Sequence, residues 1–164
     1  MNHPDTDAVG TLLRHVLDLL EGDVAKVYID QGLPEYRPRF SPIVRTLLAA
    51  GPLSIRDLAE AVGVTHSAAS QTAAQMARAG LVAHTADPRD NRRRLISLTP
   101  KARALLPQIT AEWDATVAAM ADLDAELSMS LAHLLKEVAE AVHRRPFRER
   151  IAAAQERQAA GETT

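Results

Sequence analysis

The chain has 164 residues, which is enough for one domain or for one compact domain with additional helical arms. It is 46% hydrophobic but only 3% aromatic, so we expect an aliphatic and largely helical core. The absence of cysteine excludes disulfides, Cys-ligated metals and thiol chemistry. Residues 1–7 are acidic where a secretory signal is basic, and no apolar run approaches a membrane span. These features predict a cytoplasmic protein with no membrane partner.

The net charge of −2 is unevenly distributed along the chain. Residues 1–52 carry −2, residues 53–105 carry +4 and residues 106–164 carry −4. A basic middle third between two acidic flanks is typical of a module that meets a polyanion while its flanks serve another purpose.

Apolar residues at three- and four-residue spacing predict a long amphipathic helix from about Thr6 to Asp30. The segment Gly32-Leu33-Pro34 ends this helix. A shorter helix then continues to Gly51-Pro52, which is a strong stop signal.

The next stretch predicts two short helices joined by a tight turn. Ser54 is a good N-cap, and Asp57 follows three residues later in a capping-box arrangement. Gly63 ends the first helix, and Thr65 caps a second helix that runs to about Ala79. A glycine-containing turn of this size between two helices defines a helix-turn-helix.

The second of these helices has two different faces. Its inward stripe is Ala69, Thr72, Ala73 and Met76. Its opposite face carries Ser67, Ser70, Gln71, Ala74 and Gln75. By itself, this second face is an ordinary polar helix surface.

Two β-type runs follow, at residues 81–85 and 94–98, and the link 86–93 is rich in turn-forming residues. The pattern predicts a hairpin with Arg89, Arg92, Arg93 and Arg94 on its tip and return arm. Such a cluster destabilises the fold by self-repulsion unless it lies in water or meets a negative partner.

The last third of the chain is predicted to be helical. Thr99-Pro100 is an N-cap followed by proline at the first helical position, and a helix of about twenty residues follows. Pro107 either kinks this helix or shifts its start. A long apolar stripe follows, and the chain beyond Pro146 is helical by propensity. The stripe comprises Met120, Leu123, Leu127, Leu131, Leu134, Val138 and Val142.

A helix-turn-helix followed by an arginine-tipped hairpin resembles the winged helix of the MarR (multiple antibiotic resistance regulator) family of transcription factors. The resemblance rests on LAEAVGVTHSAASQTAAQMARAGLV and on DPRDNRRRLISLTPKA, and it extends from about Gly51 to Arg103. It implies a mainly α fold in which terminal helices form a homodimer and each subunit presents one winged helix to double-stranded DNA. In many members, a small aromatic or amphipathic effector binds between the two regions and releases DNA.

The resemblance also implies roles for single residues of the second helix. Gln71 suits the N6 and N7 edge of adenine, and the serines suit bases or phosphate. Thr65 and His66 lie near phosphates in this scheme, although Thr65 serves equally well as a cap alone. The full predicted set on this helix is Thr65, His66, Ser67, Ser70, Gln71 and Gln75. The position of Gln71 is usually basic in relatives, so the operator cannot be inferred from theirs.

The arginines of the hairpin are predicted to contact DNA as well. Wing arginines of such folds reach phosphates or the minor groove, where negative potential is concentrated. Arg92 and Arg93 are expected at the tip, and Arg94 on the strand. Arg89 is expected to pair with Asp87 or Asp90 and to shape the turn.

Other binding sites have weaker sequence signals. Tyr36, Phe40 and Trp113 either line an effector pocket or are aromatic residues of the core or the dimer interface, and the sequence leaves both interpretations open. The six histidines show no metal-ligand spacing. No nucleophile–base pair or phosphate-binding loop is present. We therefore expect no metal, no cofactor and no enzymatic activity.

The sequence thus predicts a homodimeric winged-helix repressor on a pseudo-palindromic operator, released by a small molecule. Residues 1–50 and 106–164 are expected to dimerise, the first with a role in the effector pocket, and residues 51–105 to bind DNA. The alternative is a winged-helix module that binds another protein and reads no DNA sequence.

Overall fold

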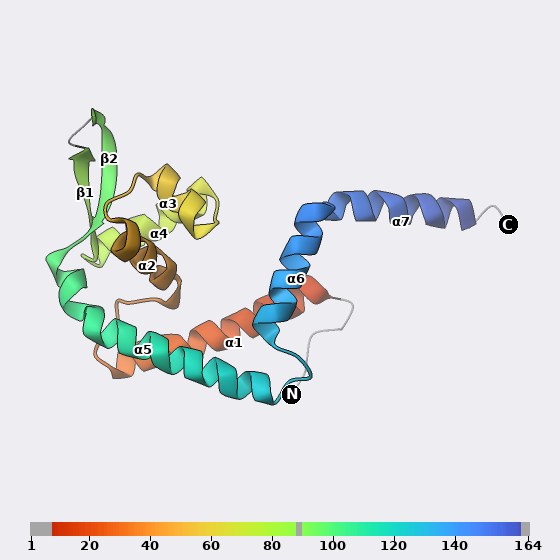
Figure 1. Cartoon of the computed structure of the whole chain (residues 1–164), viewed down its shortest axis with the longest axis horizontal. Helices are drawn as coiled ribbons and strands as arrows, with labels where there is room; N and C mark the ends of the chain where they lie inside the picture. The colour runs from red at the N-terminus through yellow and green to blue at the C-terminus, as the bar shows by residue number, and fades with distance from the viewer. Residues whose placement is uncertain (1–7, 88–89, 162–164) are drawn as a thin grey trace. The chain divides into compact units, whose positions relative to one another are not determined.

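The computed structural model describes residues 8–87 and 90–161, except for the side chains of residues 87 and 90–93. It is mainly α-helical and contains one antiparallel hairpin (Figure 1), so the predicted fold class is confirmed. The elements in chain order are α1 (Val9–Asp30), the 3-10 turn η1 (Pro38–Phe40), α2 (Ser41–Ala50), α3 (Ile55–Val62), α4 (His66–Arg78), β1 (Val82–Asp87), β2 (Asp90–Leu98), α5 (Pro100–Ala125), α6 (Leu131–Arg144) and α7 (Phe147–Gly161).

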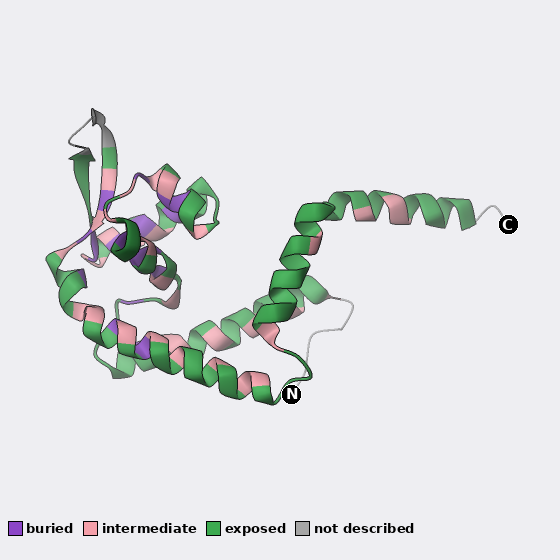
Figure 2. Cartoon of the chain, in the orientation of Figure 1, coloured by how far each residue is buried: buried purple, intermediate pink, exposed green. Residues whose placement is uncertain are grey.

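The chain divides into two compact units, residues 1–114 and residues 115–164. The first unit holds one apolar core (Figure 2). Its other helices, the hairpin and the first half of α5 all contribute to this core. Its largest fully buried side chains are Tyr28, Val44, Leu58, Met76, Ile96 and Ile109. The helix-turn-helix is therefore packed on α1, α2 and α5 residues within the same unit, which fixes the helix that follows the turn.

The predicted capping residues start and end α3 and α4. The Ser54 hydroxyl accepts a hydrogen bond from the Asp57 amide at 3.3 Å and donates to the Asp57 carboxylate at 2.8 Å. Gly63 adopts φ 76° at the C-cap of α3, in the left-handed region that glycine reaches without strain. The Thr65 hydroxyl then accepts from the Ala68 amide at 3.2 Å and starts α4. The predicted helix-turn-helix is confirmed.

The hairpin is longer than predicted. Its register pairs Val82 with Leu98 and Ala86 with Arg94, and a register shift then leads to the pair Asp87 and Asp90. The turn-forming residues of the predicted link are thus drawn into the strands, because ladder pairing outweighs their local turn preference. At this shift the step from Arg94 to Asp90 on β2 faces a single-residue step from Ala86 to Asp87 on β1, so the ladder is irregular there.

A backbone bridge fixes the hairpin to the start of the helix-turn-helix. The amide of Leu53 donates to the Ile96 carbonyl at 3.1 Å, and the Ile96 amide donates back at 2.7 Å. Ile96 is also 1% exposed and belongs to the core. The hairpin and α3 therefore form one body, as a wing requires.

The start of α5 is bonded to the end of α4. The Thr99 hydroxyl accepts from the Ala102 amide at 3.1 Å and donates to the Gly80 carbonyl at 2.7 Å. The Lys101 ammonium donates to the Ala79 carbonyl at 2.8 Å and pairs with Glu35 at 2.9 Å. Pro107 lies inside α5, which begins at Pro100, so the alternative in which proline shifts the helix start is wrong.

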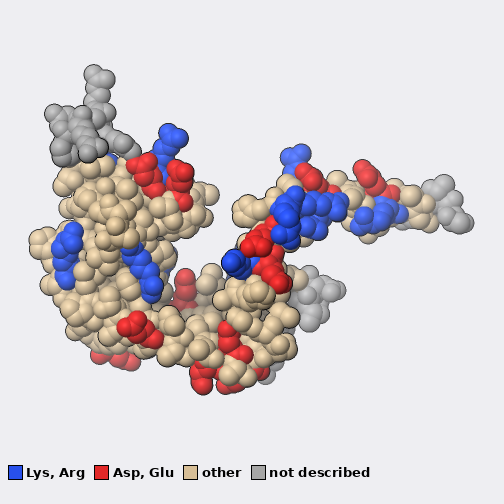
Figure 3. All heavy atoms as spheres, viewed as in Figure 1, with Lys and Arg blue, Asp and Glu red and all other residues tan. Residues whose placement is uncertain are grey.

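The second unit comprises the end of α5, α6 and α7. The predicted apolar stripe is interrupted by a turn after α5, and Ser130 caps α6 by accepting from the His133 amide. Apolar side chains of α6 and α7 remain exposed in the single chain: Leu134, Leu135, Val138, Val142, Phe147 and Ile151. Basic side chains gather where α6 meets α7 (Figure 3). Across the described residues, no helix is long and apolar enough to cross a membrane.

Candidate nucleic-acid interface

Helix α4 presents a largely polar face to solvent. Ala69, Ala73 and Met76 are buried against the core at 2% exposure or less. The opposite side of the helix exposes four of the predicted DNA-contacting residues, namely His66, Ser67, Ser70 and Gln71. Arg78 in the last turn of α4 is also exposed and lies on this side at helical spacing from Ser67 and Gln71, so the face combines hydrogen-bonding groups with one positive charge.

The two remaining predicted residues of α4 have partners within the protein. Thr65 is exposed, and its hydroxyl caps the helix as described above. Gln75 is half-buried, and its side-chain carbonyl accepts a hydrogen bond from the Arg39 guanidinium at 2.5 Å. Arg39 lies on η1, 36 residues away in sequence, and no local sequence pattern indicates this contact.

The structure describes the four arginines of the hairpin to different extents. Arg94 is exposed on β2 and lies opposite Ala86 in the register, as predicted. Arg92 and Arg93 lie on β2 rather than in the turn where we expected them, and their side chains are outside the described set. Arg89 lies entirely outside the described residues, so its predicted pairing with Asp87 or Asp90 stays a prediction.

The three aromatic residues predicted for an effector pocket are close together in the first unit. Tyr36 and Phe40 are each 2% exposed, and their ring centroids are 5.8 Å apart in an edge-to-face arrangement. Ser41 joins Tyr36 to Trp113: its hydroxyl lies 3.3 Å from the Tyr36 hydroxyl and accepts from the indole Nε1 of Trp113 at 2.9 Å. The Arg45 guanidinium stacks over the Trp113 ring, 4.1 Å from its centroid. These residues form a packed polar-aromatic cluster.

A buried carboxylate extends this cluster. Glu112 is 3% exposed, and the hydroxyl of the fully buried Tyr28 donates to its Oε2. The Tyr28 ring also lies 4.6 Å from the Tyr36 ring. Burial, and then the bond to Glu112, raises the pKa of Tyr28, and burial raises the pKa of Tyr36 to about 12. The pair joins α1 to α5 across 84 residues of sequence, so no local pattern could have predicted it.

No group of three His, Asp or Glu side chains in the described part of the chain is arranged to hold a metal ion. Exposed groups with hydrogen-bonding capacity lie on α4 and on the hairpin, and the other helices of this unit also carry exposed polar groups. The exposed polar groups of α4 and of the hairpin suit binding to a partner with an extended polar surface.

The comparisons with known proteins agree with this geometry. Residues 41–93 match the profile of the MarR family. A comparison with curated protein sequences finds no significant match.

Solved structures match most of the chain. A probable transcriptional regulator from Pseudomonas aeruginosa is 25% identical with a TM-score of 0.59, covering 83% of this chain and 97% of that one. CouR from Rhodococcus jostii RHA1, bound to p-coumaroyl-CoA, is 25% identical with a TM-score of 0.57, covering 84% and 92%. MepR from S. aureus, in a DNA complex, is 19% identical with a TM-score of 0.62, covering 82% and 96%.

Proposed function

This chain is a winged-helix protein of the MarR family, a DNA-binding transcription regulator, and on that premise we propose that it acts as a homodimeric repressor released by a small molecule. The observation that carries this proposal is the exposed, largely polar face of α4, beside a hairpin that is bonded at Ile96 to Leu53, just before α3. Such a face suits base readout in the major groove, while the arginines of β2 supply attraction to phosphates.

Within this proposal the residues of α4 and of the wing have different roles in DNA binding. Gln71 reads a base edge, and Ser67 and Ser70 contact bases or phosphate. Arg92 and Arg93 contact the backbone or the minor groove, with Arg94 beside them. Thr65 and His66 lie near the phosphates, Gln75 is held by Arg39, and Arg89 shapes the turn.

The exposed apolar side chains support a homodimer. Val9, Leu13 and Leu17 of α1 are 50–60% exposed, and Leu134 and Val138 of α6 are 39% and 50% exposed in the single chain. Soluble monomers rarely expose apolar groups in such contiguous runs. A second copy would cover these helices and would set the two α4 helices to half-sites about 34–36 Å apart. Light scattering should give twice the chain mass of 17.8 kDa.

The aromatic cluster supports an effector site next to the winged helix. Tyr36, Phe40 and Trp113 combine flat apolar rings with the polar groups of Ser41 and Glu112. The matched protein CouR holds p-coumaroyl-CoA, an aromatic acyl thioester. We propose that a small aromatic or amphipathic compound opens this cluster and changes the separation of the two α4 helices. The protein then works in the cytoplasm, where its operator lies.

The test first finds the operator by sequencing the genomic DNA fragments that the protein retains. The affinity of two variants for this operator is then measured over a range of salt concentrations. Gln71→Ala should weaken operator binding by about 1–3 kcal/mol and leave the salt slope unchanged. Arg92→Ala/Arg93→Ala should weaken binding to every sequence and reduce the slope of log K against log salt by about 0.9 for each phosphate that the variant no longer neutralises. If neither variant changes affinity and no genomic fragment is retained, the chain is instead a winged-helix module for another protein.

A further inference from the structure

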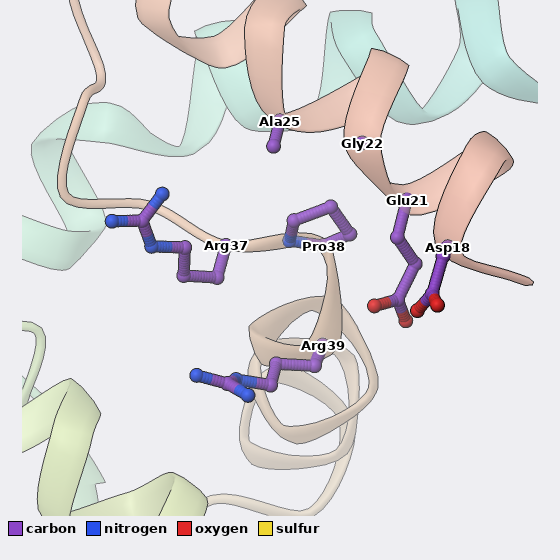
Figure 4. Close-up of a pocket in the computed structure, with 7 residues that line it drawn as sticks. All are labelled: Asp18, Glu21, Gly22, Ala25, Arg37, Pro38 and Arg39. Carbon is purple, nitrogen blue, oxygen red and sulfur yellow. The ribbon is translucent and has the colours of Figure 1, made fainter.

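A groove beside α1 has the features of a second small-molecule site. It has a volume of about 280 Å³ and runs between the middle of α1 and the segment that leads into η1 (Figure 4). Its lining includes Asp18, Glu21, Gly22 and Ala25 of α1, and Arg37 and Arg39. This volume is close to the lower end of small-molecule sites, which are about 300–1,000 Å³. None of the three predicted effector residues lines it.

The charges in the groove are separated by sign. The carboxylates of Asp18 and Glu21 lie at one end, and the guanidinium groups of Arg37 and Arg39 lie on the other side of Pro38 (Figure 4). Within the described residues, neither carboxylate has a base within ion-pair distance. A ligand that carries only negative charge would be repelled by the carboxylates, and one that carries only positive charge would be repelled by the guanidinium groups. Neither kind of ligand therefore suits both ends of the groove. A small zwitterion, with a carboxylate and an ammonium separated by a short spacer, suits both.

The wall between the two ends is made by small residues. Gly22 is in a helical conformation inside α1, and a Cβ added there would meet nothing within 4 Å. Ala25, one turn later, adds only a methyl group. The space opposite Gly22 is therefore open and is available to the spacer of the ligand.

One of the two arginines connects the groove to the DNA-reading helix. The Arg39 guanidinium that lines the groove also donates to Gln75 on α4, at 2.5 Å. Gln75 lies one turn after Gln71, on the helix that reads DNA in the proposed function. A carboxylate accepts stronger hydrogen bonds from a guanidinium than a neutral amide does. A bound carboxylate would therefore compete with Gln75 for Arg39, and it would neutralise a positive charge beside α4.

The Gly22 side of the groove remains open if the apolar stripe of α1 is covered by a second copy. At about 100° per residue, Gly22 points about 140° or more away from Val9, Leu13 and Leu17, whereas Ala25 points about 80° away from Leu17. These three apolar side chains are 50–60% exposed and belong to the stripe that a second copy would cover. A ligand can thus reach the Gly22 side of the groove in the dimer.

We infer that this groove binds a small zwitterion, its carboxylate on Arg37 and Arg39 and its ammonium on Asp18 and Glu21, and that occupancy weakens DNA binding through the Arg39–Gln75 contact. The regulatory half of this inference rests on the proposed function; the binding half does not. Because coupling is reciprocal, DNA must weaken zwitterion binding by the same factor.

Calorimetry on the full-length protein without DNA tests the site, using 4-(aminomethyl)benzoate as the probe. Its matched controls are 4-methylbenzoate, which lacks the ammonium, and benzylamine, which lacks the carboxylate. We expect the zwitterion to bind and both controls to bind at least about tenfold more weakly, because each lacks one of the two charged groups. Equal binding of the three compounds, or no heat from the zwitterion up to about 10 mM, would overturn the site.

Two glycine variants on one helix then separate blocking of the groove from general damage. Gly22→Leu fills the open space and should abolish zwitterion binding, while the helix keeps or gains stability. Gly10→Leu is the matched control: it lies on the same helix outside the groove and should bind the probe as the wild type does. Loss of binding in both variants, or in neither, would contradict the assignment.

Fluorescence anisotropy with operator DNA tests the coupling. Saturating zwitterion should raise the operator Kd by about 5- to 150-fold, the usual range of coupling between two sites. Arg39→Ala should remove this effect, whereas Arg37→Ala should weaken probe binding yet keep the coupling at saturation. A probe that binds the free protein but leaves operator affinity unchanged refutes the coupling. A protein that binds the probe but no DNA refutes the proposed function instead.

Discussion

Removing the Tyr28 hydroxyl should destabilise the first unit by a predictable amount. Tyr28 is 0% exposed, and its hydroxyl donates to Glu112, which is 3% exposed. Tyr28→Phe keeps the ring and its packing, so the change removes the hydrogen bond and creates almost no cavity. A hydrogen bond to a charged group contributes about 1.5–3 kcal/mol. We expect a loss of that size in the free energy of unfolding, or about 3–12 °C in Tm for a chain of this length.

The measurement is urea unfolding followed by circular dichroism at one fixed protein concentration, because dimerisation would otherwise shift the apparent stability. The double variant Tyr28→Phe/Glu112→Met tests the cause. Replacing both partners of a buried polar contact by apolar groups often restores stability, so the double variant should lose less than the sum of the two single variants. A loss below about 0.5 kcal/mol for Tyr28→Phe, which is typical of surface changes, would refute the reasoning.

Two further predictions concern the same unit. Ser54→Ala removes the cap of α3 and should cost about 1 kcal/mol in urea unfolding, with Ser54→Gly closer to the wild type; equal stability of all three would contradict the capping role. The raised pKa of Tyr36, about 12 against an ordinary 10.0, means that the folded state keeps a proton that the unfolded state loses above pH 10. Stability should therefore be intact below pH 10 and fall by up to about 1.4 kcal/mol per pH unit from there towards pH 12. Tyr36→Phe should make this fall shallower, and an unchanged alkaline slope would argue against burial of the phenol.

Local signals predicted the helix-turn-helix well, and contacts distant in sequence were not predictable. Ser54, Gly63 and Thr65 act through atoms within four residues of themselves, so their spacing alone determines the caps and the turn. The Tyr28–Glu112 bond spans 84 residues and depends on how α1 packs on α5, for which a single sequence holds no periodic signal.

The hairpin shows where local preference and tertiary structure compete. Turn-forming residues at 86–93 predicted a long link, yet the strands extend to Asp87 and from Asp90. The ladder begins from Val82 and Leu98, which are buried, and from Ile96, which is bonded to Leu53. Once these apolar residues set the register, continuing the pairing satisfies backbone groups that the turn preferences would leave to water.

In the proposed function, hydrogen bonding by α4 and charge on the hairpin play different parts as the protein reaches its operator. The exposed side of α4 would discriminate among sequences through the hydrogen bonds of its polar side chains, and Arg78 in its last turn adds one positive charge. The arginines of the hairpin would supply attraction that is independent of sequence and sensitive to salt. A chain with a net charge of −2 repels DNA at long range, so only the orientation that presents the basic middle third is favoured on approach. In the proposed function, the acidic flanks thereby orient the protein, and the self-repulsion of the arginines is relieved when phosphates neutralise them.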